Sequence, residues 1–154
     1  MLSALDQFIP YDENYWDYGQ VYDGLLASVP TTNQIGYRAR FIVINGKITL
    51  IPEPEFHALA MMLMIMRGWN KYPTFTFNYV DINIMEQIIR EHIGDTWSSH
   101  WSPSASIRKL AERGVLTFKR ESVAGRKNTF NYVVTFNGQI SISDHGVLCI
   151  GENK

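Results

Sequence analysis

The sequence predicts an α+β fold, and two patterns in it lead to that prediction. Runs of β-branched and aromatic residues flank tight-turn dipeptides or alternate with polar residues, which is typical of strands. Three other segments repeat apolar residues every three or four positions, which is typical of helices. The chain has 154 residues and is 45% apolar, enough for one packed domain. We expect an acidic, aromatic arm over residues 1–37, a single domain over 38–150 and a tail over 151–154.

The N-terminal arm differs from the rest of the chain in composition. Residues 1–37 contain five acidic side chains, no Lys or Arg, and several aromatic side chains. So many aromatic side chains favour packing over a solvated tail. We expect the arm to contact the domain, a second subunit or a protein partner.

Two Asn-Gly dipeptides stand between β-branched runs. The first separates residues 41–44 from 47–51, and the second separates 133–136 from 139–142. Asn and Gly both tolerate the positive φ of a type I′ turn, so the sequence predicts two independent β-hairpins. A shorter alternating stretch over 73–78 predicts a further strand.

The first predicted helix follows the first hairpin. It runs from about Glu53 or Pro54 to Arg67, with Gly68 directly after it. Its centre is apolar on all sides, so it must be covered on more than one side. Either the arm or a second subunit would cover it, and residues 57–66 are therefore a candidate homodimer contact.

The second predicted helix runs from about Asp81 or Asn83 to Ile93, because apolar residues recur there at helical spacing. Asn83 and Glu86 have the spacing of a capping pair, and Gly94 has the position of a helix end.

The third predicted helix has clear boundaries. Ser102 reads as its N-cap, Pro103 occupies the first helical position, and the helix continues to Arg113 and stops at Gly114. Tryptophans 97 and 101, before this helix, are interpreted as core packing and a hydrophobic staple, with stacking on an exposed base as the alternative.

A strand over 115–120, a basic loop over 121–128 and a returning strand to residue 136 complete the pattern. The order helix, strand, helix, helix, strand, basic loop, strand resembles the winged helix-turn-helix superfamily over residues 53–136. The most specific part is 102–116, where the third helix ends in Gly-Val-Leu before the hairpin. The resemblance implies three helices with a β-wing and binding to double-stranded DNA, and the first hairpin and the arm are additions to it.

Candidate DNA contacts lie on the third helix, since a helix fits the major groove and its N-terminal residues reach base edges. Ser104 and Ser106 are short polar side chains suited to base or phosphate contacts. Ser102 and the helix N-terminus offer N–H groups to a phosphate. Arg108 and Lys109 lie one turn further and are suited to a guanine edge or flanking phosphates.

The resemblance implies that the wing tip lies against the DNA backbone or minor groove. Arg126, Lys127 and Asn128 match the tip by position, and Lys119 and Arg120 lead into it. The formal net charge of the chain is -1, but residues 97–128 contain seven basic and two acidic residues. Such charges also occur on ordinary solvated surfaces, and their combination here favours polyanion binding.

Two functional hypotheses follow. The first is a DNA-binding winged-helix protein, a small transcriptional regulator or replication factor whose size suits a virus or mobile element. Five phosphate contacts would give a salt slope of about −4.5, so tight binding would need a dimer or an accessory partner. The alternative is a non-enzymatic interaction module that docks on a host or assembly protein through the acidic arm and the apolar first helix.

Enzyme motifs are absent from the sequence. It has no glycine-rich phosphate loop, no dinucleotide fingerprint and no nucleophile elbow, and its four histidines lack metal-ligand spacing. We therefore expect no catalysis, cofactor or metal. One cysteine and no long apolar segment indicate a cytoplasmic protein that does not enter a membrane.

Overall fold

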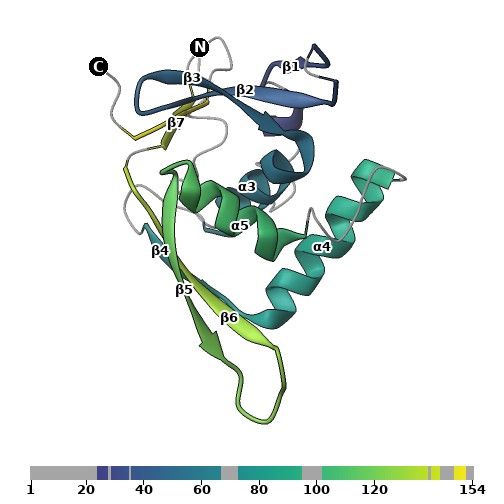
Figure 1. The fold of residues 1–154 in the computed structure, drawn as a ribbon, viewed down its shortest axis with the longest axis vertical. Coiled ribbons are helices and arrows are strands. Elements are labelled where there is room, and N and C mark those ends of the chain that lie inside the picture. The colour runs from purple at the N-terminus through teal and green to yellow at the C-terminus, as the bar shows by residue number, and fades with distance from the viewer. Residues whose placement is uncertain are drawn as a thin grey trace, which may run out of the picture.

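A computed structural model gives the fold, which is α+β as predicted (Figure 1). The arm before residue 24, Arg67 and Gly68, and the tryptophans at 97 and 101 lie outside the described residues, whereas the first helix ends at Ile65, two residues before its predicted end. The structure describes residues 24–27, 29–34, 36–66, 73–94, 102–138, 140–142 and 148–151.

The strands in the described part of the chain form two sheets. The first is built around β2 (Ala39–Ile44), which pairs antiparallel with β1 (Thr31–Thr32) and β3 (Lys47–Pro52). β2 also pairs in parallel with β8 (Leu148–Ile150), and β8 pairs antiparallel with β7 (Ile140–Ile142). The second sheet has the order β4-β6-β5, all antiparallel. Its strands are β4 (Thr74–Phe77), β5 (Leu116–Ser122) and β6 (Phe130–Phe136).

The first predicted hairpin is confirmed. β2 and β3 pair from Ala39 opposite Pro52 to Ile44 opposite Lys47. Asn45 and Gly46 form the turn with φ of 50° and 82°, the positive values that this dipeptide was expected to adopt.

The second predicted hairpin is wrong, because β6 and β7 lie in different sheets. β6 is the central strand of its sheet, and β4 and β5 already occupy both of its edges. Asn137 instead donates from its backbone N–H to the Val115 carbonyl at 3.1 Å, which directs the chain away from the sheet. A Cβ on Gly138 would lie 2.6 Å from the Cα of Gly151, so glycine lets the two backbones pass closely.

Three helices, α3 (Glu53–Ile65), α4 (Tyr79–Ile93) and α5 (Pro103–Glu112), pack between and beside the sheets. α4 begins earlier than predicted, and its cap is Asn78 with Asp81, not Asn83 with Glu86. The Asn78 side chain accepts from the Asp81 N–H at 2.9 Å, and Asp81 accepts from the Asn78 N–H at 3.0 Å. This capping box satisfies backbone donors that the end of β4 leaves exposed.

The predicted boundaries of α5 are confirmed. The hydroxyl of Ser102 accepts a hydrogen bond from the Ala105 N–H at 3.2 Å, and Pro103 is the first helical residue. Gly114 follows the helix with φ 83°, a value that glycine adopts without strain. These local signals orient α5 directly before the β5–β6 hairpin.

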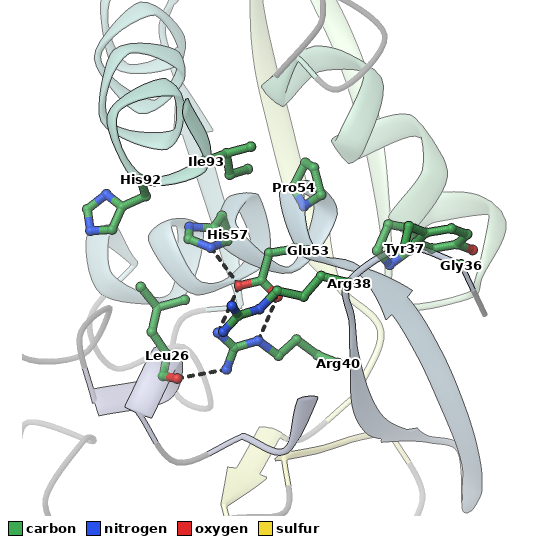
Figure 2. Close-up of a pocket in the computed structure, with 11 residues that line it drawn as sticks. Leu26, Gly36, Tyr37, Arg38, Arg40, Glu53, Pro54, His57, His92 and Ile93 are labelled. Carbon is green, nitrogen blue, oxygen red and sulfur yellow. Dashed lines mark hydrogen bonds and ion pairs between the residues drawn. The ribbon is translucent and has the colours of Figure 1, made fainter. Parts of the chain in front are cut away.

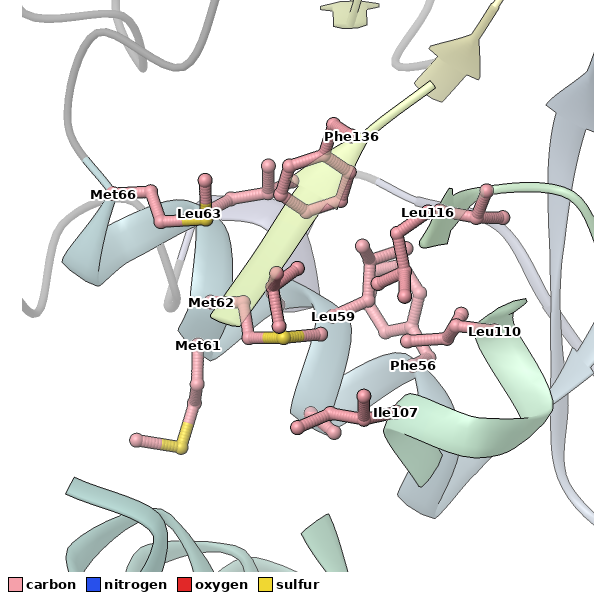
Figure 3. Packing of buried hydrophobic residues seen from close by; sticks show 14 of the residues in the cluster. Phe56, Leu59, Met61, Met62, Leu63, Met66, Ile107, Leu110, Leu116 and Phe136 are labelled. Carbon is pink, nitrogen blue, oxygen red and sulfur yellow. The ribbon is translucent and has the colours of Figure 1, made fainter. Parts of the chain in front are cut away.

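Helix α3 forms the centre of the core. It contacts β2 and β3 on one side and α4 and α5 on another. Figure 3 shows its apolar side chains packed against α5 and the β5–β6 hairpin. The side chains drawn there include Phe56, Leu59, Met62, Leu63, Ile107, Leu110, Leu116 and Phe136.

The expected homodimer contact through residues 57–66 is wrong. Every one of these residues except Ile65 is buried, and Ile65 is half-buried. The chain itself therefore covers the helix, and no broad apolar face is left for a second copy. Leu25 and Val29, from the predicted arm, also belong to the buried core.

Within the described residues, no helix combines the length and apolar character needed to cross a bilayer.

Candidate nucleic-acid interface

Two of the predicted site residues, Arg108 of α5 and Arg120 of β5, lie on the same hollow of the surface. They line a hollow of about 190 Å³ together with Phe118 and Tyr132. Side chains of a strand alternate between its two faces, so Arg120 points to the same face as Phe118. Arg120 also stands opposite Tyr132 in the register of β5 and β6. The hairpin therefore presents an arginine and two aromatic rings beside the exposed Arg108.

Lys119 does not join this group. It is opposite Val133 in the register and precedes Arg120 by one position, so its side chain lies on the other face of the sheet. Both residues were predicted as DNA contacts leading into the wing tip, and the structure separates Lys119 from the hollow that Arg120 lines. The two-residue period of a strand was the signal that could have separated them.

A second hollow of about 240 Å³ lies beside the first. Its polar lining comes from Asn83 of α4, from Ser104 of α5, and from Arg126 and Asn128 of the loop between β5 and β6. Tyr132 lines both hollows, so they are neighbouring parts of one surface. We call this the arginine surface, defined by Arg108, Arg120 and Arg126 with the polar residues Ser104 and Asn128.

Aromatic rings support two of these arginines. The Arg120 guanidinium carbon lies 4.4 Å from the centroid of Phe130, and that of Arg126 lies 4.6 Å from the centroid of Tyr79. Stacking over a ring uses the face of a guanidinium and leaves its N–H edge available to a ligand. The sequence reasoning missed Tyr79 and Phe130, and the contact with Tyr79, 47 residues from Arg126, has no local sequence signal.

The three arginines of this surface lack a carboxylate partner among the described residues. Among the described residues, no carboxylate forms an ion pair with Arg108, Arg120 or Arg126. Arginines elsewhere in the described chain do pair, as Arg40 does with Glu53 and Arg113 with Glu55. The cations of the arginine surface therefore remain available to an external anion.

Three other predicted contacts on α5 have different surroundings. Ser106 is fully buried, so it cannot reach DNA, and its hydroxyl is unpartnered among the described residues. The hydroxyl of Ser102 already accepts the capping hydrogen bond. Lys109 is half-buried and lies toward the α3 carboxylate of Glu55, where its charge opposes the rise that burial causes in the pKa of Glu55.

At the hairpin tip, Lys127 is exposed but lines neither hollow. Its carbonyl accepts a hydrogen bond from the Thr129 hydroxyl at 3.0 Å, and Asn128 has a φ of 53°. This fixed turn projects beyond the helices, as Figure 1 shows.

The described residues contain no group of three His, Cys, Asp or Glu side chains that could hold a metal ion. No family model, curated protein or solved structure matches the chain at a significant level.

Proposed function

We propose that this chain is a DNA-binding protein of the winged-helix type that holds duplex DNA against the arginine surface. The observation that carries the proposal is the convergence of three arginines from α5 and the β5–β6 hairpin, which have no acidic partner among the described residues. The order α3, β4, α4, α5, β5, β6 also agrees with the order on which the resemblance was based.

In this proposal α5 enters the major groove and the hairpin follows the backbone. Arg120 and Arg126 bind phosphates, because their stacked guanidiniums offer rigid, planar donors. Arg108 is exposed on α5 and reaches a base edge or a flanking phosphate. Ser104 and Asn128 add neutral polar contacts between these cations.

The number of contacts sets the expected strength. With Arg108 also at a phosphate, three phosphate contacts give a salt slope of about −2.7, shallower than the value expected from five. A single subunit would bind DNA weakly. Service as a transcriptional regulator or replication factor would then require a second subunit or a partner protein.

A polarisation assay with a fluorescent 20-base-pair duplex, read at low and moderate salt, tests the proposal. Arg120→Gln should weaken binding about five- to tenfold and make the salt slope shallower by about one. Lys119→Gln is the matched control, since it removes the same charge from the other face of the same strand. It should change affinity less than twofold. Equal effects of the two substitutions, or binding insensitive to salt, would contradict the proposal.

The alternative function is docking on a protein through the acidic arm and the first helix. One of these two docking surfaces, the first helix, is unavailable. α3 is buried within the chain, so its apolar face is not available to a partner. DNA binding is therefore the function that the described residues support best.

A further inference from the structure

A separate cavity of about 660 Å³ opens where β2, the start of α3 and the end of α4 come together (Figure 2). It shares no lining residue with the hollows of the arginine surface. Cavities of roughly 300–1,000 Å³ with apolar walls and a few convergent polar groups are the usual form of small-molecule sites.

A hydrogen-bonded charge network forms the base of this cavity. Arg40 donates from Nε and Nη2 to the two carboxylate oxygens of Glu53, both at 2.8 Å. Its Nη1 donates to the carbonyls of Leu26 and Val29 at 2.7 and 2.9 Å. His57 Nε2 lies 2.9 Å from Oε1 of Glu53. The hydrogen bonds of Arg40 are thus made to Glu53 and to backbone carbonyls, and not to a ligand.

The protonation states of this network follow from its contacts. Burial alone would raise the pKa of Glu53, but the hydrogen bonds from Arg40 and His57 outweigh it and lower that pKa to about 2. Burial lowers the pKa of His57 in spite of the neighbouring carboxylate, so its imidazole is neutral at pH 7. The charges of Arg40 and Glu53 therefore cancel.

Arg38 adds a positive charge that this network does not neutralise. Its side chain is 59% exposed, and its Nε forms an ion pair with Oε2 of Glu53 at 3.6 Å, so two arginines share the single negative charge of Glu53. Figure 2 shows Arg38 extending toward Glu53 at the cavity, and Pro54 and Ile93 add apolar surface to its walls. One surplus positive charge beside apolar walls favours a ligand with one negative charge and an apolar body.

We propose that this cavity binds a small organic monoanion, a carboxylate on an apolar body, with Arg38 holding the carboxylate and Leu26, Pro54 and Ile93 enclosing the body. A monoanion neutralises the cavity. A cation of the same shape meets repulsion from Arg38, and a neutral analogue leaves the one surplus positive charge of Arg38, Arg40 and Glu53 unbalanced.

Calorimetric titration with naphthalene-2-carboxylate and with the uncharged naphthalene-2-carboxamide tests this proposal. The wild-type protein should bind the carboxylate at least fivefold more tightly than the carboxamide. Arg38→Gln should remove that preference. Lys47→Gln is the control, because it removes an exposed positive charge next to the turn between β2 and β3, outside the cavity. This variant should retain the preference for the carboxylate.

Two results would overturn the proposal. The first is the absence of saturable binding of the carboxylate to the wild-type protein. The second is a carboxylate preference that Arg38→Gln leaves intact. A circular dichroism spectrum of each variant establishes that the fold is retained, as expected for substitutions of two exposed side chains.

Discussion

Two glutamates at the start of α3 have opposite ionisation behaviour, although they are only two residues apart. Glu53 accepts hydrogen bonds from Arg40 and His57, and together these lower its pKa to about 2 despite burial. Glu55 is fully buried, and burial raises its pKa although Arg113 donates to both of its oxygens. The same pair raises the pKa of Arg113, so the attraction is favourable but smaller than the desolvation of the carboxylate.

The Glu55–Arg113 pair gives the first prediction. Arg113→Met should destabilise the protein by about 2–3 kcal/mol, toward the low end for a buried pair because the arginine is 30% exposed. Glu55→Gln combined with Arg113→Met should recover most of this loss, because no charge is then left buried. Urea unfolding of the two single variants and the double variant measures the coupling. Simple additivity of the two losses would show that the pair is not coupled.

Glu53 gives a prediction about acid unfolding. Its folded pKa of about 2 lies below its ordinary value of 4.5, so its stabilisation is complete above pH 4.5 and is lost as the pH falls toward 2. This loss amounts to about 3 kcal/mol. Glu53→Gln should lose less free energy of unfolding than the wild type over that window. Parallel pH profiles for the two proteins in urea titrations would argue against this account.

His57 acts at higher pH in the same direction. Its pKa is lowered from 6.5, so the unfolded state binds a proton more readily than the folded state below that value. The stability of the wild-type protein should therefore begin to fall as the pH drops below about 6.5.

At the scale of elements, the start of α4 shows how tertiary contacts select between two capping pairs. Asn78 and Asp81 form the cap, whereas Asn83 lies within the helix and is exposed. The Tyr79 N–H also donates to the Asn131 side chain at 3.1 Å, which ties the first turn of α4 to β6. This contact extends the helix to the end of β4.

Asn78→Ala should therefore lower the free energy of unfolding by about 1 kcal/mol, because it removes the cap and its reciprocal hydrogen bond. Asn83→Ala is the control and should change stability by less than about 0.5 kcal/mol. Thermal unfolding followed by circular dichroism distinguishes the two. A larger loss for Asn83→Ala would assign the helix start to the later pair.

At the scale of the whole molecule, α3 is a central helix that its own chain covers. Met62 is fully buried, and Figure 3 shows it within the core between α3 and its neighbours. Met62→Ala should lower the free energy of unfolding by about 2–5 kcal/mol, because the cavity it leaves loses packing contacts.

The unfolding midpoint of the wild-type protein should not change with protein concentration. A midpoint that rises with concentration would indicate that folding is coupled to association.

The sequence alone determined the features that depend on neighbouring residues. Asn45-Gly46 specified a hairpin because both residues accept positive φ, and Ser102 and Gly114 bounded α5 because capping and chain reversal are local. Arg108, Arg120 and Arg126 stood out because they belong to one basic segment.

Only the tertiary structure decided which surfaces and strand edges remained available. β7 could not pair with β6 because β4 and β5 had taken both edges, and Ser106 was lost as a contact because α5 packs that side inward. The charged cavity likewise joins Arg38, Glu53 and Ile93, which have no common sequence motif. Strand pairing and burial depend on contacts between distant parts of the chain, and local patterns do not encode those contacts.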